Sequence, residues 1–247
     1  MQYDSPDSPQ SLDKHVKAYK GNSLYDFDNS ILLNWYPRRI LQLTSSRGSL
    51  LELGLGHGIS TPLFSKVFSR HVVVEGSPSV IKHFQKTNQD CSAKIIEALF
   101  ENFTSEHMFD LIVMGFVLEH VKNPKTLLRQ FGRLLTKGGS IFIAVPNAEA
   151  MNRRLGAFMG VLSDMTELSQ QDQEFGHRRY YTCATLRSEL IDAGLKIKKL
   201  EGIYMKPFTT RQMLSLQLPQ SVLNALCEIG IDYPELSLGL LAEATVN

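Results

Sequence analysis

Three glycines at alternate positions, Gly54, Gly56 and Gly58, follow a short apolar run that contains Glu52. The pattern predicts a buried strand that runs into a tight loop, with a helix beginning at Ser60. Because glycine has no Cβ, such a loop can adopt positive φ and bring a ligand against the backbone. The first N–H groups of the helix can bind the ligand's polar end. We therefore predict a nucleotide-type site at the first strand-to-helix turn of a doubly wound sheet.

The spacing of the glycines distinguishes two kinds of nucleotide site. A dinucleotide fold requires G-x-G-x-x-G, whereas this loop reads G-x-G-x-G and has Ile59 where the last glycine would stand. The second predicted strand, 71–74, ends at Glu75, at the distance where an acidic residue binds ribose hydroxyls in either kind of site. The spacing argues against a nicotinamide dinucleotide, although a glycine triplet alone is also typical of ordinary tight turns.

Further segments follow in a fixed order. Residues 109–115 read as a fourth strand that continues into 116–121, a helical pattern covers 127–135, and residues 140–145 read as a strand closed by Pro146. The segments ELGLGHG, VVVEGSP, FDLIVMGFVLEHV and LLTKGGSIFIAVPN resemble, in order and spacing, the class I S-adenosylmethionine-dependent methyltransferases. The chain looks closest to the small-molecule branch that includes the ubiquinone-biosynthesis type. The resemblance covers residues 49–147, and residues 176–202 more weakly.

The resemblance implies an α/β fold with a doubly wound, seven-stranded, mostly parallel sheet and helical or loop insertions as a lid. It also implies S-adenosylmethionine as cofactor and S-adenosylhomocysteine as product. The glycine loop would approach the methionine and ribose, Glu75 would accept both ribose hydroxyl protons, and the third strand would enclose the adenine. The expected cofactor-binding residues are Glu52, Gly54, Gly56, Gly58, Glu75, Gly76, Ser77, Glu97, Ala98, Leu99, Met114 and Gly115.

Two histidines are the candidates for a general base. His120 follows the fourth strand, where the family's loop faces the transferable methyl group. His177 lies in GHRRYYT, an altered form of the His-x-Arg-x-Tyr/Phe-Thr stretch that lines the acceptor pocket in relatives. A base is optional for methyl transfer and typically contributes about 10²–10⁴-fold. His120 could instead only hold its loop, and His177 could contact the acceptor without acting as a base.

Acceptor contacts are expected from the segments outside the core. The candidates are Tyr25, Asn147, Arg178, Arg179 and Tyr180. Because the planar guanidinium suits carboxylate or phosphate, the arginines favour an anionic metabolite if they contact it, and they could equally be solvated surface charges. We predict methyl transfer to an O or N atom of a small molecule.

Composition sets limits on partners and surroundings. The 247 residues carry a net charge of +1, which gives no general attraction to nucleic acid or to an anionic membrane. No apolar run reaches the ~18–20 residues of a membrane span. Three cysteines without metal-ligand spacing predict reduced thiols in the cytoplasm, and no metal ion is expected. The oligomeric state stays open.

The chain is expected to form a single domain over 14–247, after a disordered stretch 1–13. A helical segment over 14–47, broken at Pro37, would precede the core. The further expected parts are a cofactor-binding core 48–147, a lid insertion 148–182, and a sheet completion 183–247 with an insertion 203–235. Smaller elements expected within these parts are strands 94–97, 195–200 and 237–242, the last antiparallel, and helices from Ser77, over 183–193 and around 222–226.

Two alternatives from other classes remain open on the sequence alone. One is a nicotinamide-dependent oxidoreductase on a similar sheet, against which the glycine spacing and the EGSP and VLEHV stretches argue. The other is a methyltransferase-like protein that binds the cofactor without catalysis, which an intact cofactor site does not exclude.

Overall fold

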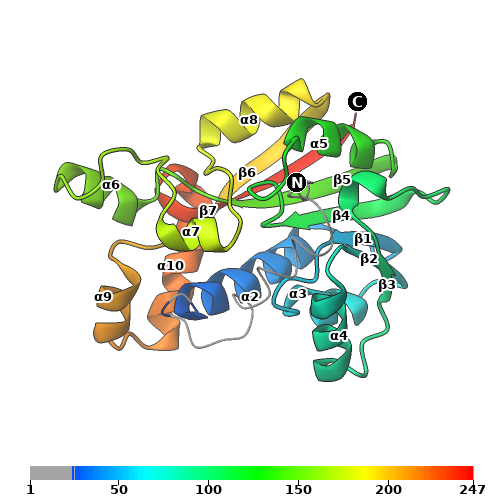
Figure 1. The fold of residues 1–247 in the computed structure, drawn as a ribbon, viewed down its shortest axis with the longest axis horizontal. Helices are drawn as coiled ribbons and strands as arrows, with labels where there is room; N and C mark the ends of the chain where they lie inside the picture. Colours follow the sequence, from blue (N-terminus) through cyan, green and yellow to red (C-terminus); the bar gives the residue numbers. More distant parts are fainter. Residues whose placement is uncertain (1–23, 25, 247) are drawn as a thin grey trace, which may run out of the picture.

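The computed structural model describes residue 24 and residues 26–246. This part of the chain has an α/β fold built on one mixed β-sheet. In that part the sheet has seven strands in the order β3-β2-β1-β4-β5-β7-β6 (Figure 1). The strands are β1 (Ser49–Leu53), β2 (Arg70–Glu75), β3 (Lys94–Glu97), β4 (Phe109–Gly115), β5 (Leu135–Pro146), β6 (Leu195–Met205) and β7 (Ser237–Val246). The first five are parallel, and β7 pairs antiparallel with both β5 and β6. The predicted doubly wound, mostly parallel sheet is confirmed.

Helices cover both faces of this sheet (Figure 1). The helices are α2 (Asp26–Leu43), α3 (Ser60–Ser65), α4 (Pro78–Thr87), α5 (Pro124–Gly132), α6 (Met151–Phe158), α7 (Gln170–Glu174), α8 (Cys183–Asp192), α9 (Thr210–Ser215) and α10 (Gln220–Asp232). Short 3₁₀ turns lie at Phe100–Asn102 and Pro234–Leu236. Within the described residues, no helix has both the length and the apolar character needed to cross a membrane.

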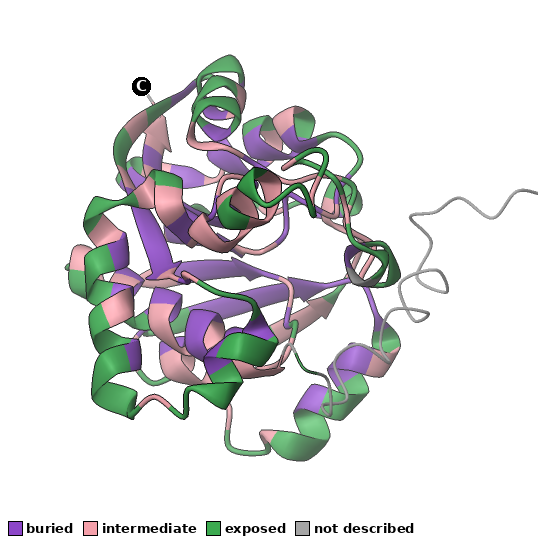
Figure 2. Ribbon diagram, turned by 90° about the vertical axis from the view of Figure 1, so that its left-hand side faces the viewer, coloured by how far each residue is buried: buried purple, intermediate pink, exposed green. Residues whose placement is uncertain are grey.

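The two faces carry separate apolar cores because successive side chains of a strand point to opposite sides. Leu51 and Ile112 pack with α5 and α8 on one face. Leu50 and Leu111 pack with α2, α3 and α10 on the other. Figure 2 shows the buried residues concentrated in the strands and the exposed residues on the outer sides of the helices. The apolar strands therefore form the centre of the fold, and the helices pack their apolar sides against it.

The prediction that the N-terminal helix breaks at Pro37 is wrong, because α2 continues through it to Leu43. A proline inside a helix removes one hydrogen bond and costs about 3 kcal/mol. Here Pro37 is itself buried, and Tyr36 and Ile40 beside it are buried against the sheet. Burial of this face offsets the lost bond. The prediction for residues 1–13 lies outside the described residues.

Three strands are longer than the sequence pattern predicts. β6 pairs with β7 from Leu195 to Met205, so the second insertion begins after Met205 instead of at residue 203. β5 begins at Leu135 and β7 continues to Val246. Gly202 explains how α10 packs closely on this pair: a Cβ there would lie 2.3 Å from the carbonyl oxygen of Gly230. The extra length comes from cross-strand pairing, which no local pattern reveals.

The carboxyl ends of β1, β2, β4 and β5 lie at one edge of the sheet, and α2 packs beside them. Tyr36 of α2 is only 3% exposed and touches the last residue of β4: a Cβ on Gly115 would lie 2.2 Å from Oη of Tyr36. Its ring also meets Phe116 edge-on, with centroids 5.7 Å apart. Glycine at position 115 therefore lets α2 approach the edge where parallel sheets bind ligands.

We expect Gly115→Ala to lower the free energy of unfolding by about 1–3 kcal/mol, the usual cost of overpacking a buried site. Denaturant unfolding would measure the loss. Gly156→Ala is the matched control, because its Cβ would meet nothing nearer than 3.7 Å. Removing the nearest atom with Tyr36→Phe should make the Gly115→Ala loss smaller. Equal losses in both backgrounds would contradict this packing.

Candidate active site

A cavity of about 730 Å³ opens at the carboxyl edge of the sheet. This volume falls within the range of about 300–1,000 Å³ that small-molecule sites occupy. Its walls come from the glycine loop after β1, the end of β2, the loop after β4, and parts of α2, α6, α7 and α9. Apolar side chains such as Leu32, Val117 and Phe175 alternate with a few ionisable groups. The cavity therefore combines a cofactor-type loop with segments that lie outside the core.

The glycine loop and Glu75 form one rigid wall of this cavity. Gly54, Gly56 and Gly58 have φ values of 81°, 48° and 71°, the left-handed region that glycine adopts without strain. The backbone N–H of Leu55 donates to Oε2 of Glu75 at 2.9 Å, and that of Ser77 donates to Oε1 at 2.8 Å. Two amides from different loops thus fix the orientation of a carboxylate that is 8% exposed.

These residues fit a nucleoside with two ribose hydroxyls. An ionised carboxylate has about four acceptor positions, so each oxygen can accept a hydroxyl in addition to a backbone amide. Gly56 lines the cavity, and a Cβ there would meet no atom within 4 Å. Gly76, Ser77, Leu99 and Gly115 also line the cavity. The wall is therefore suited to a ligand that approaches the backbone and donates to Glu75.

Other predicted cofactor residues lie behind this wall and do not line the cavity. The carboxylate of Glu52 accepts a hydrogen bond from Ser60 and lies 3.0 Å from Nε2 of His71, where it is 1% exposed. A Cβ on Gly58 would lie 2.9 Å from the ring of Phe84. Also outside the cavity lining are Glu97, Ala98 and Met114. Glu52 thus holds the start of α3 through Ser60, which itself lines the cavity.

The two predicted histidines also line the cavity, where they meet a carboxylate that the sequence did not single out. The rings of His120 and His177 are 4.7 Å apart and nearly perpendicular. One nitrogen of each ring and one oxygen of Glu119 lie within 4.8 Å of one another, a spacing that would also admit a metal ion. Glu119 is fully buried, and neither of its oxygens has a hydrogen-bond partner among the described residues. Burial raises the pKa of Glu119 to about 7, although the charge of His177 opposes it.

Asp172 of α7 orients His177 from the other side. Oδ1 of Asp172 lies 3.3 Å from Nδ1 of His177. Asp172 also accepts hydrogen bonds from the hydroxyls of Ser169 and Tyr180. Burial alone would raise the pKa of Asp172, but the contacts with His177 and Ser169 lower it to about 2. Burial would likewise lower the pKa of His177, yet Asp172 and Glu119 raise it above the ordinary 6.5. His177 thus lies between two acidic groups.

The predicted acceptor residues divide into two groups. Tyr180 lines the cavity, whereas Arg178 and Arg179 do not. Nε of Arg178 donates to the carbonyl oxygen of His120 at 2.8 Å. The backbone N–H of Arg178 donates to the carbonyl oxygen of Glu119, also at 2.8 Å. The arginine therefore ties the segment before α8 to the loop after β4. Tyr25 lies outside the described residues.

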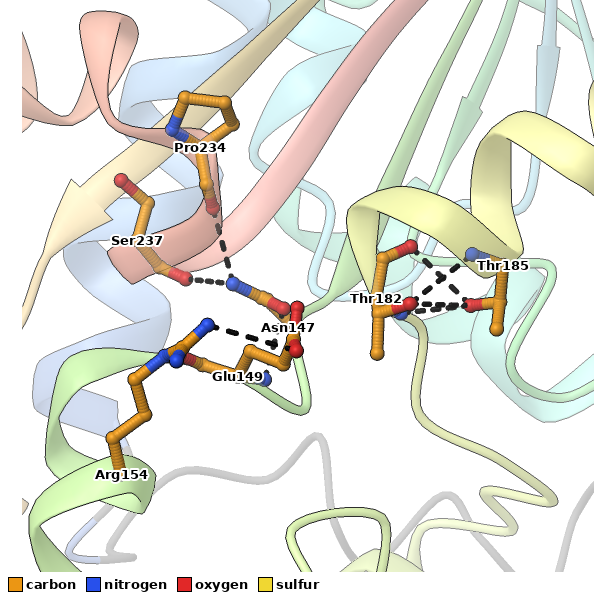
Figure 3. A network of polar contacts seen from close by, with 7 residues as sticks. All are labelled: Asn147, Glu149, Arg154, Thr182, Thr185, Pro234 and Ser237. Atoms are coloured by element: carbon orange, nitrogen blue, oxygen red, sulfur yellow. Dashed lines mark hydrogen bonds and ion pairs between the residues drawn. The ribbon is translucent and has the colours of Figure 1, made fainter.

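Asn147 is buried and holds the end of β5 in place. Its amide nitrogen donates to the carbonyl oxygens of Pro234 and Ser237 at 3.1 and 2.8 Å (Figure 3). The same view shows Glu149 paired with Arg154. Asn147 does not line the cavity. The side chain that was predicted to contact the acceptor therefore positions the strand that ends at the cavity.

Several cavity residues gave no signal in the sequence. Glu119 lies inside the VLEHV stretch beside His120, and only its burial distinguishes it from a solvated carboxylate. Asp28 and Lys206 meet across 178 residues of sequence. Only the fold brings such residues together.

Comparisons with known proteins agree with this geometry. The family described as methyltransferase domain matches residues 32–200. A ubiquinone biosynthesis O-methyltransferase from Parvibaculum lavamentivorans is 26% identical over 171 residues, which are 67% of this chain and 65% of that relative. This match therefore spans just under two thirds of the relative's length.

Solved structures share the fold at low sequence identity. One is the N-methyltransferase NodS from Bradyrhizobium japonicum WM9, in complex with S-adenosylhomocysteine. It is 15% identical with a TM-score of 0.58, and the match covers 96% of this chain and 97% of that chain. Another is magnesium protoporphyrin IX methyltransferase from Synechocystis PCC 6803, also with S-adenosylhomocysteine bound. It is 12% identical with a TM-score of 0.61, and the match covers 96% of this chain and 95% of that chain. Both likenesses therefore extend over the sheet and over the segments that line the cavity.

Proposed function

Because the chain belongs to the methyltransferase domain family and is a class I S-adenosylmethionine-dependent methyltransferase, we propose that it methylates an O or N atom of a small molecule held in the 730 Å³ cavity. One observation carries this proposal: Glu75 and the His120–His177 pair line the same cavity. A nucleoside site and a set of proton-accepting groups thus share one enclosed space. Oxygen is the first choice, since the relative from Parvibaculum lavamentivorans is named an O-methyltransferase.

Glu75 and the glycine loop hold the nucleoside in this proposal. S-adenosylmethionine supplies a methyl group on a sulfonium sulfur that is already activated for displacement. The protein then has to position the methyl donor and the acceptor, which can lower the activation barrier by up to about 7–11 kcal/mol. The two backbone amides on Glu75 serve this purpose, because they fix the carboxylate before any ligand binds.

The cluster of Glu119, His120 and His177 faces the acceptor's nucleophile. His177 is the better-supported base, because Asp172 lies 3.3 Å from its Nδ1 and leaves Nε2 for the acceptor's proton. Asp172 meets Nδ1 as an ion-pair partner without hydrogen-bond geometry, so its charge favours one placement of the ring. His120 packs against the same ring and is the second candidate. The proton of a hydroxyl or amine acceptor would move to one of these imidazoles.

The charge of the acceptor follows from where the arginines lie. Arg178 and Arg179 turn toward carbonyl oxygens of His120 and Lys122, and Arg153, which does line the cavity, donates to the carbonyl oxygens of Met165 and Glu167. The two arginines that had favoured an anionic metabolite, Arg178 and Arg179, thus lie outside the cavity lining, and the guanidinium of Arg153 is turned toward backbone carbonyls. A neutral acceptor therefore has better support than an anionic one.

Calorimetric titration and methyl transfer test the proposal together. The wild-type protein should bind S-adenosylhomocysteine and give no heat with NAD. Radiolabelled methyl groups should pass from S-adenosylmethionine to members of a panel of small phenols, alcohols, amines and carboxylates. Cofactor binding without transfer to any member, or transfer only to macromolecules, would contradict a small-molecule acceptor.

A further inference from the structure

A buried ion pair lies in the cavity wall formed by α2 and α9. Nζ of Lys206 donates to Oδ2 of Asp28 at 2.6 Å and to Oγ1 of Thr210 at 2.6 Å. Thr210 in turn donates to Oδ2 of Asp28 at 2.5 Å. The three residues are 3–5% exposed, and all of them line the cavity. No role in methyl transfer described above uses them.

This group of three has one acceptor and one donor left over. Oδ1 of Asp28 is buried and has no hydrogen-bond partner among the described residues. The Lys206 ammonium has three N–H donors, two of which go to Asp28 and Thr210. Oδ1 of Asn152, on α6 in the same cavity, is likewise buried without a partner among the described residues. Unpaired buried polar atoms in a ligand cavity indicate a ligand that pairs them.

A purely structural role explains the pair less well. The ion pair does connect α2 with the segment between β6 and α9, but burying two charges costs much of what their attraction returns. Leaving a carboxylate oxygen unpaired adds a further penalty. A structural connection would be expected to give both carboxylate oxygens a hydrogen bond, as Asp172 accepts one at Oδ2 from Ser169 and one at Oδ1 from Tyr180. The open oxygen therefore points to recognition.

We propose that Asp28 and Lys206 bind a hydroxyl group of the methyl acceptor, which makes the acceptor a neutral, hydroxylated molecule. A hydroxyl is both donor and acceptor, so one oxygen can donate to Oδ1 of Asp28 and accept from Nζ of Lys206. Leu32 and Leu33 on the same helix supply apolar surface for the carbon skeleton. This inference rests on the proposed function, because it assigns the acceptor to the same cavity.

The paired charges argue against a charged group at this position. An anion would lie against the open oxygen of Asp28, and a cation would lie against the Lys206 ammonium. Because the two formal charges cancel, the site offers directed hydrogen bonds with little net field. Removing either partner should therefore change which charge the site accepts.

Three one-ring probes that differ in a single group make this testable: benzyl alcohol, benzoate and benzylamine. Their affinities for the protein saturated with S-adenosylhomocysteine would be measured by ligand-observed NMR titration. The wild type should bind benzyl alcohol at least tenfold more tightly than the other two. Lys206→Met leaves Asp28 unpaired and should shift the preference to benzylamine, whereas Asp28→Asn leaves Lys206 unpaired and should shift it to benzoate.

Matched controls separate the possible failures. Lys125→Met removes an exposed ion pair with Asp192 and should keep the wild-type preference. The double variant Asp28→Asn/Lys206→Met carries neither charge, so it should show no preference above threefold and covers the case that a single variant does not fold. The same ranking of the three probes in all folded variants would overturn the inference. Failure of the wild type to bind S-adenosylhomocysteine would instead count against the proposed function.

Discussion

Replacing His177 with alanine should lower kcat by about 10²–10⁴-fold, the usual contribution of a general base. The reason is geometric: His177 lies between Asp172 and Glu119, its ring packs on His120, and it lines the cavity that contains the nucleoside wall. Cofactor affinity should stay within twofold of the wild type, because Glu75 and the glycine loop are unchanged. Steady-state kinetics with an acceptor found in the panel, together with titration of S-adenosylhomocysteine, would measure both quantities.

The dependence on pH gives a second measure of the same role. A base acts in its neutral form, so kcat should be low below the pKa of His177 and rise through it. Asp172 and Glu119 raise this pKa above the ordinary 6.5, so the rise should occur above that value. Asp172→Asn removes one of these influences and should move the rise to lower pH. A rise that stays in place in Asp172→Asn would mean that another group titrates.

His120 and two controls complete this test. His120→Ala should cost more than His177→Ala if His120 is the base, and the pH step should disappear with whichever residue carries it. His83→Ala, on the exposed side of α4, should leave kcat unchanged. Treatment with a chelator should also have no effect, and loss of activity would show that the cluster holds a metal ion. Losses under tenfold in both histidine variants would mean that positioning alone carries the reaction.

Local sequence signals predicted the sheet well because each strand and loop there is defined by neighbouring residues. The glycine loop has positive φ at three positions, and each of these positions is occupied by glycine, the residue that adopts positive φ without strain. Glu75 could be named as a candidate because it ends an apolar strand at a recognisable distance from the loop. The ends of β6 and β7 were underestimated, since their pairing depends on a partner strand far along the chain.

Side-chain contacts around the cavity could not be predicted in the same way. Arg178 and Asn147 have side chains suited to a ligand, yet each is used for carbonyl oxygens of distant segments. Asp28 and Lys206 are unremarkable in sequence and become a possible binding group only because the fold buries them together. The residue type determines which hydrogen bonds and ion pairs a side chain can form. Whether its partner is a ligand or another part of the protein depends on the fold.

Replacing Glu75 with alanine should weaken binding of S-adenosylhomocysteine by about 1.5–3 kcal/mol, the range for hydrogen bonds to a charged group. This corresponds to an increase in Kd of about 10- to 150-fold. The backbone amides of Leu55 and Ser77 would also lose their acceptor, so the loop should become less ordered and the melting temperature should fall. Calorimetric titration and thermal unfolding of the same samples would separate the two effects.

Two further variants decide whether Glu75 binds the cofactor or only supports the loop. Glu75→Gln keeps one oxygen as an acceptor for a backbone amide but loses the charge. It should therefore retain more of the thermal stability than Glu75→Ala, while binding of S-adenosylhomocysteine stays weak. Glu106→Ala removes an exposed carboxylate beyond β3 and should change neither quantity. If Glu75→Gln bound as tightly as the wild type, the carboxylate's charge would have no part in holding the ribose, and Glu75 would be a support for the glycine loop alone.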